Sequence, residues 1–135
     1  ALGVARQNSL RHGTDGRVCL VQADLLDCFP ERPCFEFVLS NPPYIAGAES
    51  DTLPPEVRDH EPREALFAGS SGLEFYRRLL PAAAVRLAAG GWLLIEVGVG
   101  QADAVASMAT GQGLSVAEIL RDLQGISRCL VLRRN

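Results

Sequence analysis

Hydrophobic residues in this chain of 135 residues fall into short apolar runs and into segments with helical spacing. The short runs predict strands, because they are apolar and are bounded by turn-forming residues. They are Arg17–Ala23, Phe35–Ser40, Trp92–Val97, Leu114–Arg121 and Ser127–Leu132. The last two are joined at Gln124-Gly125, which is too short for a parallel crossover, so we expect an antiparallel hairpin there.

Helical spacing, with apolar residues every three to four positions, marks two further segments. The first runs from about Gly72 to Ala88, and Gly90-Gly91 is expected to stop it. The second runs from Gln101 to Thr110. The opening residues, from Ala1 to Asn8, are typical of the tail of a helix.

The alternation of strands and helices predicts an α/β fold with a mainly parallel sheet and a C-terminal antiparallel hairpin. The run Phe35–Ser40 is largely apolar, which is typical of a strand covered on both faces. Asn41–Gly69 contains five prolines and predicts a long loop with one helical turn. In parallel sheets, ligands bind beyond the carboxyl ends of the strands. The loop that begins at Asn41 is therefore the expected place for chemistry.

Charge and composition narrow the class of protein. The net charge is −3, from 13 basic and 16 acidic residues, so no basic excess indicates a nucleic-acid binder. No apolar run approaches the roughly 20 residues that span a bilayer, and we expect a cytoplasmic protein without membrane contact. The four cysteines form no C-x-x-C pair, so no metal site is expected, and the thiols should be reduced and mostly buried.

The segment Ser40-Asn41-Pro42-Pro43-Tyr44 directly follows the second predicted strand. Each proline biases the residue before it toward extended geometry, and neither proline has an N–H group. The result is a rigid corner that presents the side-chain oxygen of Asn41, the carbonyl oxygen of Pro42 and the ring of Tyr44. A Pro-Pro pair taken alone is better explained as a plain strand exit, but these neighbours favour a chemical role.

Two acceptors at such a corner can hold a planar –NH2 group and stabilise the positive charge that grows on its nitrogen during attack. The lone pair of an amide or aromatic amine is delocalised, so the electrophile must be activated. A sulfonium methyl group is the natural candidate, and the Tyr44 ring can exclude water. Neither His12 nor His60 lies in a recognisable triad or metal motif that would compete with this interpretation.

Asn-Pro-Pro-Tyr after an apolar strand resembles the amino-methyltransferases among the S-adenosylmethionine-dependent class I methyltransferases. Members of that branch act on nucleic-acid bases or on protein glutamine. Further segments resemble the protein-glutamine enzymes, and in particular the release-factor branch called HemK or PrmC, over essentially the whole chain. These segments are Glu56-Val57-Arg58, Glu61-Pro62, Ala65-Leu66, Gly72–Arg78, Gly90–Glu96 and Arg121–Arg128.

This resemblance implies a Rossmann-like sheet that methylates the glutamine of the Gly-Gly-Gln motif in peptide chain release factors. Asn41 and the Pro42 carbonyl would hold the glutamine amide, and Pro43 would fix the corner. Tyr44 would pack beside the amide. Glu61 would shape the substrate-side loop, although a solvated charge explains it equally well.

The resemblance also implies a cofactor site for S-adenosylmethionine. Asn41 would lie near its methyl group, and Asp24 would lie beside its adenine. Leu25 stands where many relatives carry an aromatic residue, so stacking on the adenine would be weak or absent. The family's glycine-rich cofactor loop and ribose-binding acid are missing, and Gly98-x-Gly100 is an ordinary strand-to-helix turn rather than a substitute.

These departures lead to the expectation that residues 1–135 are a partial catalytic domain without the first strands, the glycine-rich loop and the family's N-terminal helical domain. Three alternatives stay open. The enzyme could methylate a ribosomal protein glutamine or a nucleic-acid base, or the chain could be a truncated, inactive piece that binds only a partner.

Overall fold

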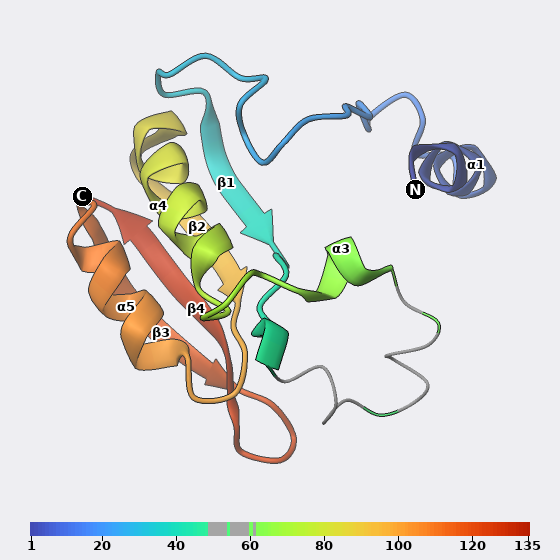
Figure 1. The fold of residues 1–135 in the computed structure, drawn as a ribbon. Helices are drawn as coiled ribbons and strands as arrows, with labels where there is room; N and C mark the ends of the chain where they lie inside the picture. Colours follow the sequence, from blue (N-terminus) through green and yellow to red (C-terminus); the bar gives the residue numbers. More distant parts are fainter. Residues whose placement is uncertain (49–53, 55–59, 61) are drawn as a thin grey trace.

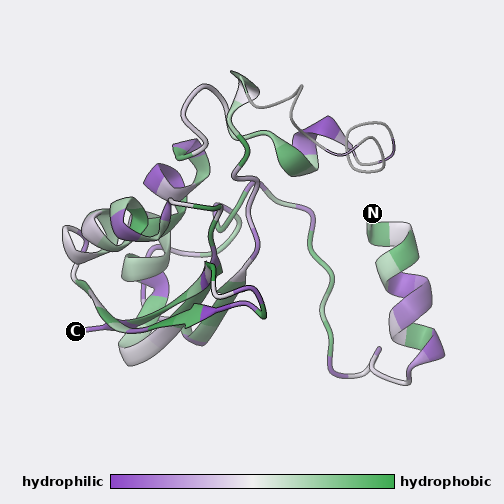
Figure 2. Cartoon of the chain, turned by 90° about the horizontal axis from the view of Figure 1, so that it is seen from below, coloured by the Kyte–Doolittle hydropathy of each residue, from purple (hydrophilic) through white to green (hydrophobic). Residues whose placement is uncertain are grey.

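A computed structural model describes residues 1–48, 54, 60 and 62–135. These residues form one sheet with two helices packed on it, while α1 stands apart from the sheet (Figures 1 and 2). The elements in chain order are α1 (Leu2–Arg11), β1 (Phe35–Ser40), α3 (Arg63–Leu66), α4 (Glu74–Arg86), β2 (Leu87–Glu96), α5 (Ala102–Thr110), β3 (Leu114–Arg121) and β4 (Ser127–Arg134).

The four described strands lie in the order β1-β2-β4-β3. β1 and β2 are parallel, and β4 runs antiparallel to both β2 and β3. The α/β class and the C-terminal hairpin are therefore confirmed, in a mixed sheet. The parallel pair places the carboxyl ends of β1 and β2 side by side, with Ser40 opposite Ile95.

Helices α4 and α5 cover the same face of the sheet. Because alternate strand residues point to opposite faces, only one set of strand side chains is buried under these helices. Leu93 and Ile95 of β2 are fully buried under these helices, together with Tyr76 and Val105. On the other face, Phe37 is 60% and Leu39 is 75% exposed. The expectation that Phe35–Ser40 is covered on both faces is thus wrong for the described structure, since both helices pack on the same side.

The prediction of a strand at Arg17–Ala23 is also wrong, because residues 18–23 adopt no regular secondary structure. An apolar run becomes a strand only when another strand supplies hydrogen-bond partners. Among the described residues, β1 is paired along one edge only, with β2. Residues 18–23 are therefore part of the irregular segment that connects α1 to β1 (Figure 1).

The boundary between α4 and β2 differs from the prediction as well. The helix ends at Arg86, and β2 begins at Leu87, before the Gly90-Gly91 pair that was expected to stop the helix. Leu87 already pairs with Phe35, and the register then shifts before Phe37 pairs with Trp92. A Cβ atom on Gly91 would come within 3.0 Å of the Glu36 carbonyl oxygen, so β1 and β2 can approach this closely only because residue 91 is a glycine.

Arg86 anchors the irregular segment to the end of α4. It is only 5% exposed, and its guanidinium group donates to the Phe29 carbonyl oxygen from Nε at 3.1 Å and from Nη2 at 2.9 Å. The Cys34 N–H donates in turn to the Arg86 carbonyl oxygen at 2.8 Å. A buried guanidinium requires such partners. These bonds hold the entry to β1 against the helix, although most of residues 12–34 is exposed.

The cysteines do not match the expectation of mostly buried thiols. All four are free, but Cys19, Cys28 and Cys34 are exposed, because the irregular segment that carries them packs little against the core. In the described part of the chain, no group of three or more His, Cys, Asp or Glu side chains is arranged to hold a metal ion. None of the described helices is long and apolar enough to span a membrane.

Glu74, at the start of α4, gives the fold a testable acid dependence. Its carboxylate accepts hydrogen bonds from the Ser71 N–H at 2.9 Å and from the hydroxyls of Ser71 and Ser70 at 3.0 and 3.2 Å. The bond from the Ser71 backbone is the main reason that the pKa of Glu74 is lowered from 4.5 to about 2. Hydrogen bonds that favour the charged form lower the pKa of a carboxyl group.

We expect Glu74 to stabilise the fold fully above pH 4.5 and to lose this effect as the pH falls toward 2, because its pKa is lower in the folded than in the unfolded state. In Glu74→Gln, the dependence of the unfolding midpoint on pH should be shallower over this range. The measurement is urea unfolding at several pH values, with Glu118→Gln on β3 as the control. Parallel curves for Glu74→Gln and the unmodified chain would contradict this role.

Candidate active site

The Asn-Pro-Pro-Tyr corner leaves the carboxyl end of β1, where the sequence predicts it. The Asn41 side chain is exposed, Pro42 is buried, and Pro43 and Tyr44 are half-buried. The two prolines close the strand because they offer no N–H group to continue its pairing. The corner therefore presents Asn41 to solvent, whereas Pro42 beside it is buried.

Tyr44 turns its hydroxyl back to the neighbouring strand. It donates to Glu96 Oε1 at 3.2 Å, and Glu96 is the last residue of β2. The buried Tyr76 of α4 reaches the same point, since its hydroxyl lies 3.1 Å from the Glu96 carbonyl oxygen. Burial raises the pKa of Tyr76, so this phenol stays protonated and acts as a donor at neutral pH.

The long loop after the corner returns to the sheet and is held there by backbone hydrogen bonds. The Ile45 N–H donates to the Leu66 carbonyl oxygen at 3.0 Å, and the Ala68 N–H donates to the Ile45 carbonyl oxygen at 2.9 Å. Ile45 and Phe67 thus form an isolated parallel bridge. Among the described residues of the predicted long loop, Arg63–Leu66 form the short helix α3, which lies next to this bridge (Figure 1).

Two cavities meet at Asn41. The first, of about 300 Å³, is lined by residues 41–45 of the corner and by Ala65 and Leu66 at α3. The second, of about 410 Å³, is lined by residues 39–41 and by Leu94, Glu96, Arg128 and Cys129. Asn41 borders both. Asn41 is thus placed where it can contact groups in both cavities.

The structure does not bring all the predicted site residues together. Asp24 is ion-paired with Arg78 of α4 at 2.6 Å, and Leu25 is half-buried against the core with a φ of 50°. Neither residue lines the two cavities at Asn41. Glu61 lies outside the described residues.

Arg128 is held at the second cavity by the β3–β4 hairpin, which explains one of the motifs singled out in the sequence. Asp122 Oδ1 accepts the N–H groups of Gln124 at 2.9 Å and Ile126 at 3.0 Å, and Asp122 Oδ2 accepts from Arg128 Nε at 3.1 Å. These bonds lower the pKa of Asp122, the bond from the Ile126 N–H most of all. Gly125 supplies the positive φ of the turn. The Arg121–Arg128 motif is therefore a turn that carries Arg128 to the site.

The sequence did not indicate that Glu96 and Gln101 contact Tyr44. Glu96 ends an apolar strand, and a charged residue at the carboxyl end of a parallel strand is the signal that marks it. Gln101 follows the β2–α5 turn, where nothing local distinguishes it from a surface residue. Two of its hydrogen-bond partners, Gly72 and Tyr44, are 29 and 57 positions away.

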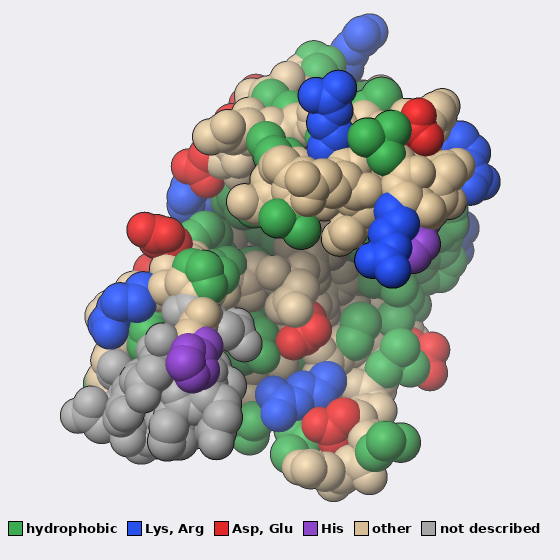
Figure 3. Space-filling model, turned by 90° about the vertical axis from the view of Figure 1, so that its right-hand side faces the viewer, with side chains coloured by type: hydrophobic (Ala, Val, Ile, Leu, Met, Phe, Trp, Pro, Cys, Tyr) green, Lys and Arg blue, Asp and Glu red, His purple; other side chains and the backbone are tan. Residues whose placement is uncertain are grey.

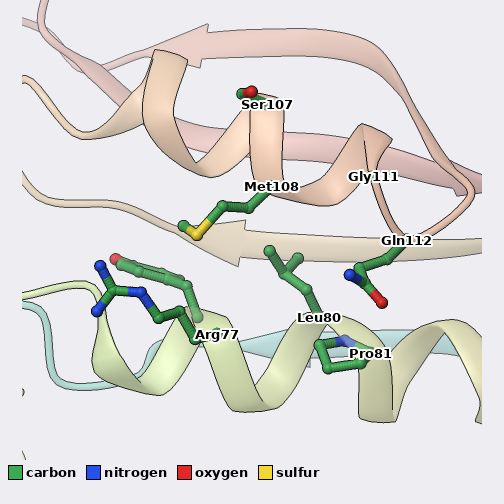
Figure 4. Close-up of a pocket in the computed structure, with 8 residues that line it drawn as sticks. Arg77, Leu80, Pro81, Ser107, Met108, Gly111 and Gln112 are labelled. Carbon is green, nitrogen blue, oxygen red and sulfur yellow. The ribbon is translucent and has the colours of Figure 1, made fainter.

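The remaining surface offers weaker candidates. Basic and acidic side chains are interspersed on the face in Figure 3, where no patch of one sign stands out. Another cavity, of about 310 Å³, lies between α4 and α5, where Leu80 and Met108 form its apolar part and Arg77 lies at its edge (Figure 4). Tyr76 also lines it.

Comparison with known proteins identifies relatives in sequence and in structure. No protein-family model matches the chain. The release factor glutamine methyltransferase of Geobacter sulfurreducens is 43% identical over 128 residues, which are 95% of this chain and 44% of that protein. The enzyme of the same name from Cereibacter sphaeroides is 41% identical over 98% of this chain and 47% of its own length.

A solved structure supports the fold. The crystal structure of TrmN from Thermus thermophilus matches 99% of this chain and 33% of its own chain, with a TM-score of 0.61 and 18% identity. The chain spans a little under half of the relatives that it matches in sequence. By sequence, it is similar to the release factor glutamine methyltransferases over nearly the whole of its own length.

Proposed function

We propose that the protein transfers a methyl group from S-adenosylmethionine to the side-chain amide nitrogen of the glutamine in the Gly-Gly-Gln motif of peptide chain release factors. Residues 1–135 would be part of its catalytic domain. The observation that carries the proposal is the exposed Asn41 carboxamide on a proline-stiffened corner between two cavities. The relatives named for this activity support it.

The corner's own atoms account for the handling of the amide. The side-chain oxygen of Asn41 and the carbonyl oxygen of Pro42 accept hydrogen bonds from the two N–H groups of the substrate amide. These hydrogen bonds orient its nitrogen for attack. The same acceptors stabilise the positive charge that develops on this nitrogen. Pro43 keeps the two acceptors in place, and Tyr44 walls the site and excludes water. Glu61 remains a proposed contributor on the substrate side.

S-adenosylmethionine supplies the activated methyl group when it is bound. The structure fits the methyl-accepting side of such a site, because Asn41 reaches both cavities. It does not fit the proposed adenine contacts equally well, because the Asp24 carboxylate is ion-paired with Arg78. The contact of Asp24 with the adenine therefore requires that this exposed ion pair open, which is a small cost for a surface pair. Leu25 stays a proposed neighbour of the adenine.

The proposal is tested by methyl transfer from radiolabelled S-adenosylmethionine to a purified release factor. The protein that carries this sequence is the enzyme, and a release factor with Gln→Ala in its Gly-Gly-Gln motif is the control substrate. We expect label on the unmodified release factor only. Label on a ribosomal protein or on RNA instead would replace the proposed substrate, and no label on any of them would overturn the proposed activity.

A further inference from the structure

Gln101, the residue before α5, connects three segments around the corner. Its Nε2 donates to the Tyr44 carbonyl oxygen at 2.9 Å and lies 3.4 Å from the Gly72 carbonyl oxygen. Its Oε1 accepts from the Gly98 N–H at 3.0 Å and lies 3.3 Å from the Tyr76 hydroxyl. A carboxamide alone among side chains of this length offers donors on one atom and an acceptor on the other.

Two glycines make room for this arrangement. A Cβ atom on Gly98 would lie 2.7 Å from Gln101 Oε1 and 3.0 Å from the Tyr44 ring. A Cβ atom on Gly72 would lie 2.7 Å from Gln101 Nε2 and 2.5 Å from the Tyr44 carbonyl oxygen. The backbone thus approaches the Gln101 amide from two sides. Such close packing confines the amide to one orientation.

We propose that Gln101 is a positioning residue, which sets the orientation of the Asn-Pro-Pro-Tyr corner by holding the Tyr44 carbonyl oxygen against α4 and the β2–α5 turn. This inference rests on the proposed function, because it assigns a purpose to the position of the corner. The hydrogen bond from Gln101 Nε2, which we call the Gln101 tether, acts at the carbonyl of Tyr44, while the Glu96 carboxylate holds the hydroxyl of the same residue. Tyr44 is thus held at both ends.

The tether fixes the acceptors that precede Tyr44 in the chain. Pro42 and Pro43 have restricted φ angles, so a shift at Tyr44 is passed on to Asn41 instead of being absorbed between them. A displacement of about 1 Å in a reacting group can lower a rate roughly a hundredfold. Gln101 therefore affects the chemical step without contact with the substrate.

The test is Gln101→Glu, made in the protein that carries this sequence. A carboxylate keeps the size of the side chain and can still accept from the Gly98 N–H and the Tyr76 hydroxyl. It cannot donate to the Tyr44 carbonyl oxygen, and it repels that oxygen instead. Gln112→Glu, on the exposed turn after α5, introduces the same charge elsewhere and is the matched control. Gln101→Met keeps the length and removes the polar contacts without adding a charge.

We expect Gln101→Glu and Gln101→Met to lower kcat roughly 10- to 100-fold, while KM for the release factor changes much less. Gln112→Glu should leave both constants unchanged. A folded Gln101→Glu protein with unchanged kcat would overturn the inference. So would a loss that appears only in KM.

Amide hydrogen exchange supplies a readout that does not depend on activity. Exchange in residues 44–46 should be faster in Gln101→Glu than in the unmodified protein, whereas exchange in β4 should be unchanged. Unchanged exchange in residues 44–46 would show that Gln101 does not hold the corner. Faster exchange in a protein that methylates no substrate would uphold the tether and refute the proposed function.

Discussion

Replacing Asn41 with alanine is expected to lower methyl transfer by about a hundredfold or more, the usual cost of removing one transition-state hydrogen-bonding group. The variant loses the side-chain acceptor and keeps the Pro42 carbonyl, so the substrate amide is held at one point instead of two. The side chain is exposed, and its removal leaves no cavity in the core. The measurement is kcat with a purified release factor, together with the Kd of S-adenosylmethionine.

Binding of the cofactor should be reduced less than turnover, because Asn41 is only one of the groups expected near the cofactor. Asn8→Ala in α1 is a matched control, since it removes the same carboxamide at a distance from the corner. Near-normal turnover in Asn41→Ala would refute the assigned role. Equal losses in turnover and in cofactor affinity would make Asn41 a cofactor-binding residue alone.

Gly72→Ala is expected to lower the stability of the fold strongly, because a Cβ atom there makes the shortest contact among the described glycines. Gly72 has a φ of 74°, and its new Cβ would meet the Tyr44 carbonyl oxygen at 2.5 Å. The left-handed backbone costs about 1–2 kcal/mol for alanine. Overpacking against backbone costs ~1–3 kcal/mol more, because a carbonyl group cannot rotate away as a flexible side chain can. The free energy of unfolding should therefore fall by roughly 3 kcal/mol.

Gly113→Ala separates the two causes. Gly113 has a φ of 76°, but a Cβ atom there meets no atom within 4 Å, so only the backbone cost remains. Its free energy of unfolding should fall by about 1–2 kcal/mol, and its methyl transfer should be unchanged. The comparison is made by denaturant unfolding of both variants at pH 7. Equal losses in the two variants would show that the Tyr44 carbonyl moves freely and that the corner is not tightly held.

Local sequence patterns correctly predicted the elements whose secondary structure depends mainly on residues nearby in the chain. Phe35–Ser40 and Leu114–Arg121 agree with β1 and β3, and the expected hairpin is formed by Asp122 and Gly125. The run Arg17–Ala23 has the composition of a strand, yet it has no strand beside it in the described structure. The composition of a segment indicates its tendency to form a strand, but a strand also needs a second strand that supplies backbone hydrogen bonds.

The boundary at Gly90-Gly91 was mistaken for a comparable reason. Glycine after a helical pattern usually marks the end of a helix. Here β1 competes for the same residues, and pairing of Leu87 with Phe35 ends the helix earlier. The glycines then serve the close approach of two strands, which cannot be seen from either strand alone.

The sequence by itself determined the α/β class, the hairpin and the corner with Asn41, because these depend on short-range alternation, turn residues and proline geometry. Only the tertiary structure decided the surroundings of that corner: the Tyr44–Glu96 bond, the two cavities and the Gln101 tether. Each of these joins residues from separate elements, so it exists only once packing of α4 and α5 on the sheet has brought them within hydrogen-bonding distance. The chemical groups of a side chain follow from the sequence, but the groups that it contacts depend on the tertiary packing of the whole fold.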